Sequence, residues 1–422
     1  MNNSPKEILR FVEEHDVKFI RLTFCDVFGN LKNIAIMPNE LEQAFSCGVP
    51  FDSAKFDESA PELLLVPDIA TLSVLPWRPK SGRVVRFFCN LKSPDGSDYS
   101  ADMRTDLTNY INQLRLKGYS CEISTRCEFY LFDLDEKGEP TKNPHDKGGY
   151  LDVAPLDKCE NIRREICLSL EEIGLNPKSS CHKHGPAQNE IDFRANSPVN
   201  AADDMVHYKT VVKSVAAQSG LFASFMPMPL ENEHGSALNI SLKLKKNGKD
   251  IFGTFPDALT HEGKCFISGI LRRIAEITAF LNPTVNSYCR FGVGSAPKDI
   301  CFSGSDRTAL VRLSAANGIS PKVDIRSADA ACNPYIAFKL ILAAGIEGIA
   351  EGNAENFSSF SQNLPENLET ALDIARSSDF VRRNLPAKAA ELIFSRMDSQ
   401  LQKFSSFNSP AAFSDKYYFH YI

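Results

Sequence analysis

Residues 124–132 read "STRCEFYLF", and residues 181–191 read "CHKHGPAQNEI". Both stretches are typical of strands that carry acidic side chains into a site, Glu128 in the first and Glu190 in the second. Side chains two positions apart in a strand project from the same face, so Arg126 lies beside Glu128. Lys183 likewise brings a basic side chain into the second stretch. The chain therefore places cations among the carboxylates of this site.

Two further stretches repeat this pattern of polar side chains at alternating positions. Asn239 and Ser241 share one face of "LNIS", and Asp324 and Arg326 share one face of "VDIR". A sheet face that gathers Glu, Asp, Asn and Arg from several strands is either an active site or a face exposed to solvent. The residues leave both interpretations open.

These strands belong to the second of two predicted parts of the chain. From residue 17 to about residue 90, short apolar or alternating runs separated by turn signals such as "DVFGN" predict a small, mostly β domain. Beyond residue 100, helical patterns alternate with strands, which predicts an α+β domain. Residues 179–195 read as one strand, and the tail from Pro365 as two helices. The other predicted helices span 102–117, 161–173, 201–218, 263–281 and 333–351.

Composition excludes several classes of protein. The chain has 422 residues, is 43% hydrophobic and contains no apolar run long enough to cross a bilayer, so we expect no membrane partner. Its first twenty residues carry charges throughout, and its twelve cysteines are scattered singly, which predicts a cytoplasmic protein with reduced thiols. A net charge of -6 without a long basic stripe argues against a nucleic-acid partner.

Eight blocks in order, among them "FDSAKF" (51–56), "HGSALNISL" (234–242), "DRTALVR" (306–312) and "DIRSADAACNPYIAF" (324–338), resemble the glutamine synthetase family, type I-like bacterial members above all. The resemblance implies an N-terminal β-grasp domain (1–100) and a catalytic-type domain (101–422) with a curved antiparallel sheet. It also implies a homo-oligomer of six-membered rings stacked into a dodecamer. Its active sites would lie between neighbouring subunits, where Asp52 of one subunit would serve as a catalytic residue in the next.

The family's chemistry makes the acidic positions important. ATP phosphorylates the side-chain carboxylate of glutamate, ammonia displaces phosphate, and two or more divalent metals held chiefly by Glu neutralise the anions. By the resemblance, Glu128 and Glu190 are retained ligands, whereas Arg126 and Lys183 each replace a Glu. The remaining metal-site positions are Asn239 and Ser241, each in place of a His, and Asp324, in place of a longer Glu.

The family's anion-binding residues are largely kept. By the resemblance, Arg290 holds the substrate α-carboxylate, while Arg307, Arg312 and Arg326 face phosphate and the transferred group. His234 and Gly235 lie in the turn that contacts an amino-acid ligand. The alternatives are that the arginines hold the site's own carboxylates and that His234 is a surface residue.

Three alternatives concern the basic and soft side chains. Pairs of Arg126 with Glu128 and of Lys183 with Glu190 would compensate buried charge after loss of metal. Arg126 could instead extend to solvent. His182 and His184, with Cys127 and Cys181 nearby, could suggest zinc. Local packing or pairing is the favoured interpretation, because Lys183 rather than His184 occupies the position that faces the site in the family.

These departures favour a homologue that has lost ordinary metal- and ATP-dependent glutamate–ammonia ligation and acts as a binding, regulatory or structural assembly protein. In the family's closing flap, Ser295 also stands where a Glu works as acid and base. This reading predicts no metal and no cofactor, with a small anionic or amino-acid ligand. The alternative is an active ATP-dependent carboxylate–amine ligase, with ATP and Mg or Mn, acting on glutamate or a related acid with ammonia or another amine. An ordinary glutamine synthetase is the third hypothesis.

Overall fold

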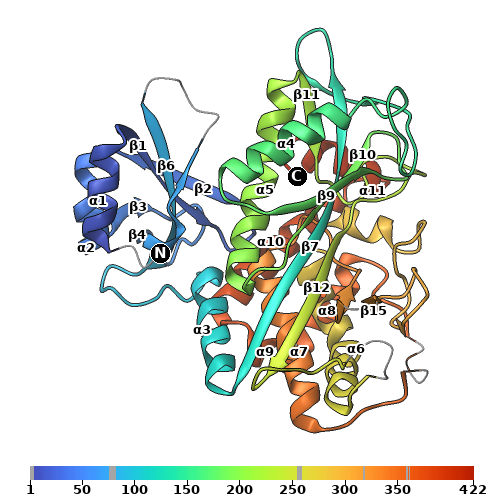
Figure 1. Cartoon of the computed structure of the whole chain (residues 1–422). Helices are drawn as coiled ribbons and strands as arrows, with labels where there is room; N and C mark the ends of the chain where they lie inside the picture. Colours follow the sequence, from blue (N-terminus) through green and yellow to red (C-terminus); the bar gives the residue numbers. More distant parts are fainter. Residues whose placement is uncertain (1–3, 76–81, 254–258, 317–318, 358–359, 361) are drawn as a thin grey trace.

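The structure is a computed structural model that describes residues 4–422, apart from 76–81, 254–258, 317–318, 358–359 and 361. An N-terminal sheet with strand order β2-β1-β6-β4-β3, in which β5 pairs with β6, lies to one side of a larger C-terminal part (Figure 1). Its elements are α1 (Pro5–Glu14), β1 (Val17–Cys25), β2 (Leu31–Ile36), η1 (Pro38–Glu40), α2 (Leu41–Cys47), β3 (Val49–Asp52), β4 (Glu62–Pro67), η2 (Ile69–Thr71), β5 (Ser73–Val74) and β6 (Arg83–Lys92).

The N-terminal sheet has its own apolar core. Ile20 and Leu22 on β1 and Phe87 on β6 are fully buried, and β1 runs parallel to β6. Helix α1 contributes Ile8 to this core and begins with a capping box at Ser4, whose side chain accepts from the Glu7 N–H. Alternating apolar side chains therefore produce the small β domain that the sequence predicts.

The C-terminal part is built on a long mixed sheet. Among the described residues its strand order is β14-β15-β16-β12-β7-β10-β9, with β8 and β11 also paired to β7 and β13 paired to β12. The strands are β7 (Tyr119–Leu134), β8 (Pro140–Pro144), β9 (Pro177–His182), β10 (Gln188–Phe193), β11 (Leu221–Ser224), β12 (Leu238–Lys246), β13 (Lys249–Asp250), β14 (Phe302–Ser303), β15 (Val311–Ala316) and β16 (Ile319–Ile325).

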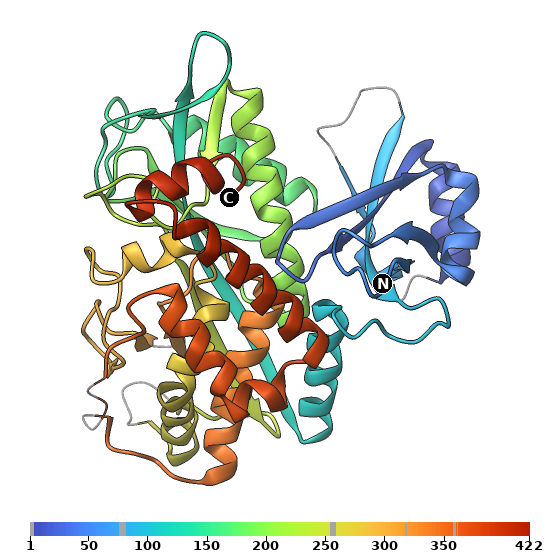
Figure 2. The same cartoon turned by 180° about the vertical axis from the view of Figure 1, so that it is seen from behind.

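Helices pack against this sheet, and Figure 2 shows the long helix α10, in dark red, crossing the back of the molecule. Helices α6 and α7 pack together, and α5 packs against β7 and β11. The predicted α+β fold is confirmed. The helices are α3 (Met103–Leu116), α4 (Glu160–Glu172), α5 (Pro198–Gln218), α6 (His261–Leu281), η3 (Val285–Arg290), α7 (Pro334–Glu351), α8 (Leu368–Ser377), α9 (Asp379–Asn384), α10 (Ala387–Phe404) and α11 (Pro410–Tyr417).

Two sequence-based expectations need correction. Residues 179–195 do not form one strand: they supply parts of β9 and β10, which pair in antiparallel fashion around a turn. Pro186 has no N–H to give to a ladder, and Ala187 has a φ of 52°, so the chain reverses there. The tail after Pro365 contains α8, α9, α10 and α11 rather than two helices. Its short connections separate segments that read as continuous helical patterns.

A buried ion-pair network connects the N-terminal sheet to the C-terminal part. Arg104 on α3 lies 2.9 Å from Asp203 on α5 and 2.8 Å from Asp68, which follows β4. Tyr335 also donates to Asp203, at 2.6 Å. The domain boundary after residue 100 stays a prediction. Within the described part of the chain, every helix is too short or too polar to cross a membrane.

Candidate functional site

The strand order brings the polar residues named from the sequence onto neighbouring strands. Glu190 on β10 is the direct partner of Glu128 on β7, and Arg126 on β7 is the partner of Asn239 on β12. Further along the sheet, Asp324 on β16 pairs with Ser241 on β12 and with Arg312 on β15. Five strands thus contribute polar side chains to one region of the sheet.

Lys183 lies between the two glutamates. Its Nζ is 3.3 Å from Glu128 Oε1 and 3.2 Å from Glu190 Oε1. The three side chains are largely shielded from water, with 16% of Lys183 and 10% of each glutamate exposed. Burial lowers the pKa of Lys183, but the two carboxylate charges outweigh burial, so its pKa lies above the usual value. Lys183 is therefore an ammonium ion at this position.

Arg126 has a different partner from the one expected. Its Nη2 lies 3.6 Å from Asp324 Oδ2, whereas Glu128 faces Lys183 and accepts the Ala237 N–H at 2.8 Å. Arg126 and Glu128, which are two positions apart on β7, therefore do not form an ion pair, because Glu128 already pairs with Lys183. The Arg126 side chain is 35% exposed, so it reaches solvent while it contacts the buried Asp324.

The two serines beside Asp324 explain how this carboxylate is held. Ser241 Oγ donates to Asp324 Oδ1 at 2.6 Å, and Ser314 Oγ donates to the other oxygen. Asp324 is 2% exposed. The Asp324 carboxylate therefore already has hydrogen-bond donors on both oxygens, in addition to the guanidinium of Arg126.

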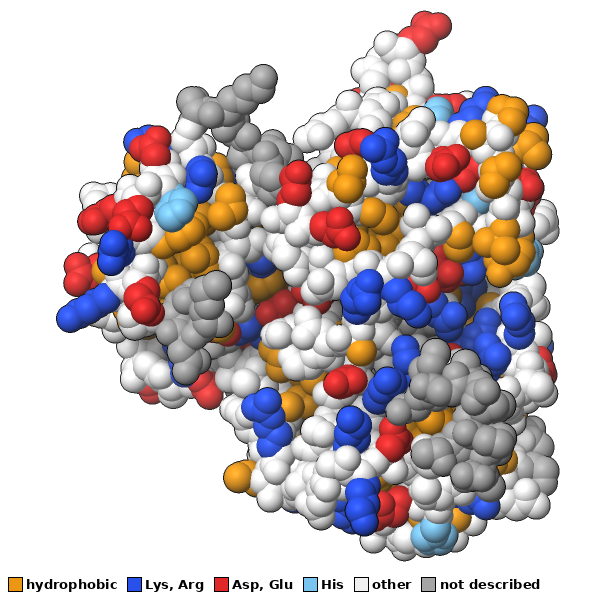
Figure 3. Space-filling model, viewed as in Figure 1, with side chains coloured by type: hydrophobic (Ala, Val, Ile, Leu, Met, Phe, Trp, Pro, Cys, Tyr) orange, Lys and Arg blue, Asp and Glu red, His pale blue; other side chains and the backbone are white. Residues whose placement is uncertain are grey.

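Arginine side chains around these carboxylates have hydrogen-bond donors that are not used within the described residues. Buried N–H groups of Arg126 (Nε), Arg312 (Nε) and Arg326 (Nη1) have no acceptor among the described residues. Burial, followed by the positive charges of Arg312 and Arg126, lowers the pKa of Arg326 to about 10. Figure 3 shows Lys and Arg side chains gathered in a hollow on this face of the C-terminal part. Such a cluster favours an anionic ligand.

Arg290 lies deeper than the other candidate arginines. It is 1% exposed and donates through Nη2 to the carbonyls of Ser327 and Ala328. Gly235 packs against it: a Cβ at Gly235 would lie 2.4 Å from Arg290 Cγ and 2.6 Å from the Pro227 carbonyl oxygen. A side chain at residue 235 would therefore displace Arg290. The assignment of Arg290 to a substrate carboxylate stays a prediction.

His234 belongs to a stack of rings at the edge of this site. Its ring lies 4.7 Å from that of His184, which stacks at 4.4 Å on Tyr150. The hydroxyl of Tyr130 donates to the His234 carbonyl, and Gln188 donates to the Gly235 carbonyl at 3.0 Å. These bonds attach the 234–235 turn to the turn between β9 and β10.

Two predicted residues lie apart from this cluster. Asp52 is the last residue of β3, and Figure 1 shows β3 in the N-terminal sheet, away from β7, β10 and β12. Its carboxylate is exposed and accepts the Ala54 N–H at 2.9 Å. Arg307 is exposed in the loop before β15. Their participation in the site stays a prediction.

A buried pair that the sequence did not reveal supports the β9–β10 turn. His182 donates through Nε2 to Asp146 at 2.9 Å and through Nδ1 to the Lys183 carbonyl at 2.8 Å. Both ring nitrogens therefore carry protons. Asp146 also accepts the N–H groups of Gly148 (3.1 Å), Lys158 (3.0 Å) and Ala187 (2.8 Å). No local sequence pattern predicts this contact, because Asp146 and His182 are 36 positions apart in the chain.

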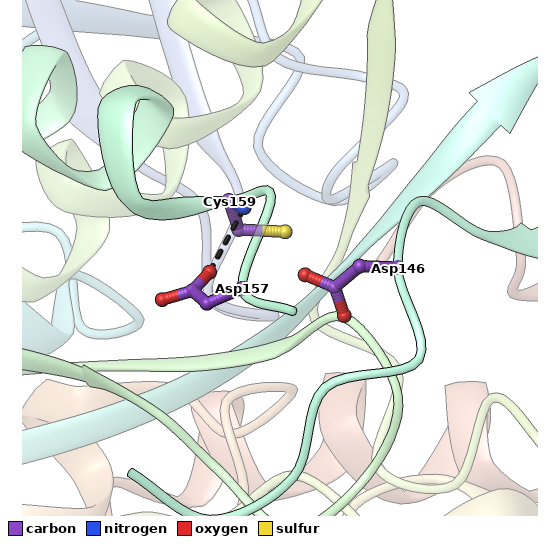
Figure 4. Close-up of side chains that lie close together, drawn as sticks. All are labelled: Asp146, Asp157 and Cys159. Carbon is purple, nitrogen blue, oxygen red and sulfur yellow. Dashed lines mark hydrogen bonds between the residues drawn. The ribbon is translucent and has the colours of Figure 1, made fainter. Parts of the chain in front are cut away.

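Asp146 also belongs to a compact group with Asp157 and Cys159, whose ligand atoms lie within 4.8 Å of one another (Figure 4). The Asp157 carboxylate already has partners within the protein. It forms an ion pair with Arg163, and it accepts a hydrogen bond of 2.9 Å from the Cys159 N–H. Burial raises the pKa of the Cys159 thiol, which keeps it protonated. We interpret this group as structural.

The residues considered for zinc do not converge. His182 is bonded to Asp146, His184 is stacked between rings, and Cys127 is buried in the core. Cys181 is 3.9 Å from Glu190. Local packing, rather than a zinc site, accounts for their positions.

The divalent metals that the resemblance implies also do not fit the carboxylates as they are arranged. An ion between Glu128 and Glu190 needs their oxygens at roughly 2.0–2.6 Å, and the Lys183 ammonium lies between them instead. Arg126 contacts Asp324 in a similar way. We therefore derive no catalytic step through a metal.

A large cavity lies elsewhere in the molecule. It has a volume of about 1570 Å³ and is bordered by the 26–32 and 54–59 loops, α5, α10 and α11. None of the carboxylates or arginines discussed above lines it. This cavity is therefore separate from the candidate site.

Solved structures share the whole fold. A GmaS/ADP complex superimposes with a TM-score of 0.85 and 24% identity, covering 95% of this chain and 97% of that one. The glutamine synthetase of Plasmodium falciparum gives a TM-score of 0.86 with 20% identity, covering 99% of both chains. At these identities the likeness establishes the fold.

Relatives in sequence correct the function expected above. Glutamine synthetase of Methanosarcina mazei is 39% identical over 406 residues, that of Clostridium saccharobutylicum 37% over 404 and that of Staphylococcus aureus 35% over 407. The matches cover 90% of this chain and 90–91% of those enzymes. The expectation of a homologue that has lost ligation and acts only in binding, regulation or assembly is therefore wrong. Basic residues at the ligand positions neutralise carboxylates, but they do not demonstrate that catalysis is lost.

Family models match both parts of the chain. The glutamine synthetase β-grasp domain matches residues 16–94, and the glutamine synthetase catalytic domain matches residues 100–415. Together with the relatives in sequence, these matches show that the chain belongs to the glutamine synthetase family.

Proposed function

We propose that this protein is an ATP-dependent carboxylate–amine ligase that joins glutamate or a related acid to ammonia or another amine. The observation that carries the proposal is the group of arginines with unused, buried N–H donors beside the Glu and Asp residues of the sheet. Membership in the glutamine synthetase family supports the reaction class. Phosphoryl transfer to a carboxylate depends on this kind of charge neutralisation.

The reaction has two steps. In the first, a substrate carboxylate oxygen attacks the γ-phosphorus of ATP, and ADP leaves with the electrons of the broken P–O bond. In the second, the amine attacks the acyl carbon, a C–N bond forms, and phosphate leaves as the amine gives up a proton. The guanidinium groups of Arg126, Arg312 and Arg326, which have unused N–H donors, would bind phosphoryl oxygens and stabilise the charge on them.

The remaining assignments follow from family membership. Arg290 and the turn at His234 and Gly235 would bind the acid, and Arg307 would contact the phosphates. Asp52 of a neighbouring copy would accept the amine proton, which requires the chain to assemble. We propose six-membered rings stacked in pairs, a state that native mass spectrometry and light scattering can measure.

Phosphate release provides the test. Purified protein is incubated with ATP, L-glutamate and a panel of amines that includes ammonia, with and without Mg²⁺ or Mn²⁺, and the amide product is identified by mass spectrometry. We expect phosphate release that depends on both the acid and one amine. Arg312→Gln should reduce the rate, whereas Arg164→Gln, a change on the exposed face of α4, should not.

The dependence of phosphate release on the acid and on the amine distinguishes a ligase from an ATPase. Phosphate release that ignores both substrates would indicate an ATPase, and the absence of any amide product across the panel would contradict the proposal. Product formed with only one amine would identify the substrate.

A further inference from the structure

The direct pairing of Glu190 with Glu128 across β10 and β7 creates a repulsion that the fold has to compensate. Like charges directly opposite each other on neighbouring strands are destabilising, and here both side chains are 10% exposed, so water screens them little. Burial, followed by the charge of Glu128, raises the pKa of Glu190. The Lys183 ammonium, 3.3 Å from one carboxylate and 3.2 Å from the other, offsets this repulsion.

We propose that Lys183 is a resident cation of this site, seated between Glu128 and Glu190 so that these two carboxylates do not bind a divalent metal. The proposal rests on the proposed function only in assigning these residues to the ligase site. It adds that the chain itself carries the positive charge between these two carboxylates.

The contacts around Lys183 hold its backbone in place. The Lys183 N–H donates to the Gln188 carbonyl at 2.7 Å, and the Gln188 N–H donates to the Gly185 carbonyl at 3.1 Å. The preceding residue, His182, is fully buried against Asp146. The turn therefore fixes the backbone of Lys183, and the two ion pairs hold its ammonium group at the carboxylates.

The distances leave no room for a second cation. The ammonium is 3.2 Å and 3.3 Å from the same oxygens that a divalent ion would need within roughly 2.0–2.6 Å. An ion bound there would lie next to a like charge. Lys183 also lies 5.7 Å from the centre of the Tyr150 ring, which stabilises the ammonium in this position.

Removal of the ammonium should convert the pair of glutamates into a metal site. Lys183→Glu would place three carboxylates close together. Lys183→Gln would leave the two carboxylates of Glu128 and Glu190 beside a neutral amide oxygen. Carboxylate and amide oxygens are hard ligands, which Mg²⁺ and Mn²⁺ prefer. Lys183→Arg keeps the charge. Lys137→Glu makes the same charge change at the exposed tip between β7 and β8 and serves as the control.

The experiment is a Mn²⁺ titration followed by electron paramagnetic resonance of the free ion, without ATP, acid or amine. We expect Lys183→Glu to bind one Mn²⁺ per chain with a Kd at least tenfold lower than that of the unaltered chain. Lys183→Gln should also bind this ion more tightly than the unaltered chain, but less tightly than Lys183→Glu. Lys183→Arg and Lys137→Glu should behave as the unaltered chain does. Adding Glu128→Gln to Lys183→Gln leaves Glu190 as the only carboxylate of the three positions and should abolish the gain.

Three results would overturn the proposal. The first is tight Mn²⁺ binding by the unaltered chain that Glu128→Gln removes. The second is no gain in Lys183→Glu or Lys183→Gln when circular dichroism shows them folded. The third is a gain in Lys183→Gln that survives the addition of Glu128→Gln. None depends on turnover. Failure of the ligase assay and failure of this inference are therefore distinguishable.

Discussion

Arg126 reaches across strand β12 to Asp324: its Nη2 lies 3.6 Å from Asp324 Oδ2, although the two residues sit on strands β7 and β16, which do not pair with each other. The guanidinium therefore spans Asn239 and Ser241, the residues of β12 that lie between them. Because one of its buried N–H groups has no acceptor among the described residues, Arg126 can hold Asp324 and an anion at the same time.

Arg126→Gln should weaken nucleotide binding. A charge-assisted hydrogen bond contributes about 1.5–3 kcal/mol, and the partial exposure of Arg126 favours the lower end, so we expect about a tenfold increase in the Kd for ATP. Isothermal titration with ATP measures it. Arg164→Gln on α4 is the matched control, and an unchanged Kd in Arg126→Gln would remove Arg126 from the nucleotide site.

The depressed pKa of Arg326 predicts that phosphate stabilises the fold. Burial and the charges of Arg312 and Arg126 lower that pKa to about 10, and a bound anion relieves this repulsion. Since a ligand of the folded state raises stability by mass action, inorganic phosphate should raise Tm by about 2 °C or more. Thermal denaturation with sodium phosphate, compared with sodium chloride at equal ionic strength, measures the shift. Arg326→Gln should lose most of it; an equal shift in this variant would show that phosphate binds elsewhere.

Local patterns predict the elements of this fold better than their pairing. The apolar periodicity at 263–281 and 333–351 identified α6 and α7 to within two residues, because their buried faces repeat at helical spacing. The period of two likewise placed Arg126 and Glu128 on one face. Their partners could not be predicted in the same way: Lys183 and Asp324 reach them through strand order, for which a single sequence carries no local signal.

The supporting contacts behind the site were the least predictable. His182 and Lys183 are adjacent, yet one is buried against Asp146 and the other lies between two glutamates. The sequence suggested a single strand there, and a turn in place of that strand changes which side chains face inward. Family resemblance located the departures at Arg126 and Lys183, but a charge substitution does not reveal whether catalysis persists.

The His182–Asp146 pair predicts a pH-dependent stability. Burial lowers the pKa of His182, but the hydrogen bond and charge of Asp146 outweigh it, so the folded-state pKa lies above 6.5. This contribution is complete below pH 6.5 and is lost as pH rises through the folded-state pKa. The pKa of Asp146 is lowered despite burial, chiefly by its bond to His182, so its contribution is present above pH 3.8 and lost at lower pH.

His182→Gln should therefore cost more stability at pH 6 than at pH 9. Breaking a buried charge pair costs roughly 3–5 kcal/mol, and we expect that loss in the free energy of unfolding at pH 6 and a smaller loss at pH 9. Urea denaturation at both pH values measures the difference. His420→Gln, at an exposed position, should change little at either pH. Equal losses for His182→Gln at both pH values would show that folding does not raise the pKa of His182.

Arg104 should be among the most important charged residues for stability. Its side chain is 5% exposed and pairs with Asp203, which is 7% exposed, and with Asp68. Arg104→Met leaves the buried carboxylate of Asp203 without its cation, which predicts a loss of roughly 3–5 kcal/mol in the free energy of unfolding. Arg382→Met removes an ion pair with Asp379 whose side chains are 61% and 76% exposed, and should cost at most about 1 kcal/mol. Chemical denaturation of both variants measures the contrast. Losses of similar size would mean that Asp203 takes up a proton or finds another donor, with Tyr335 the nearest candidate at 2.6 Å.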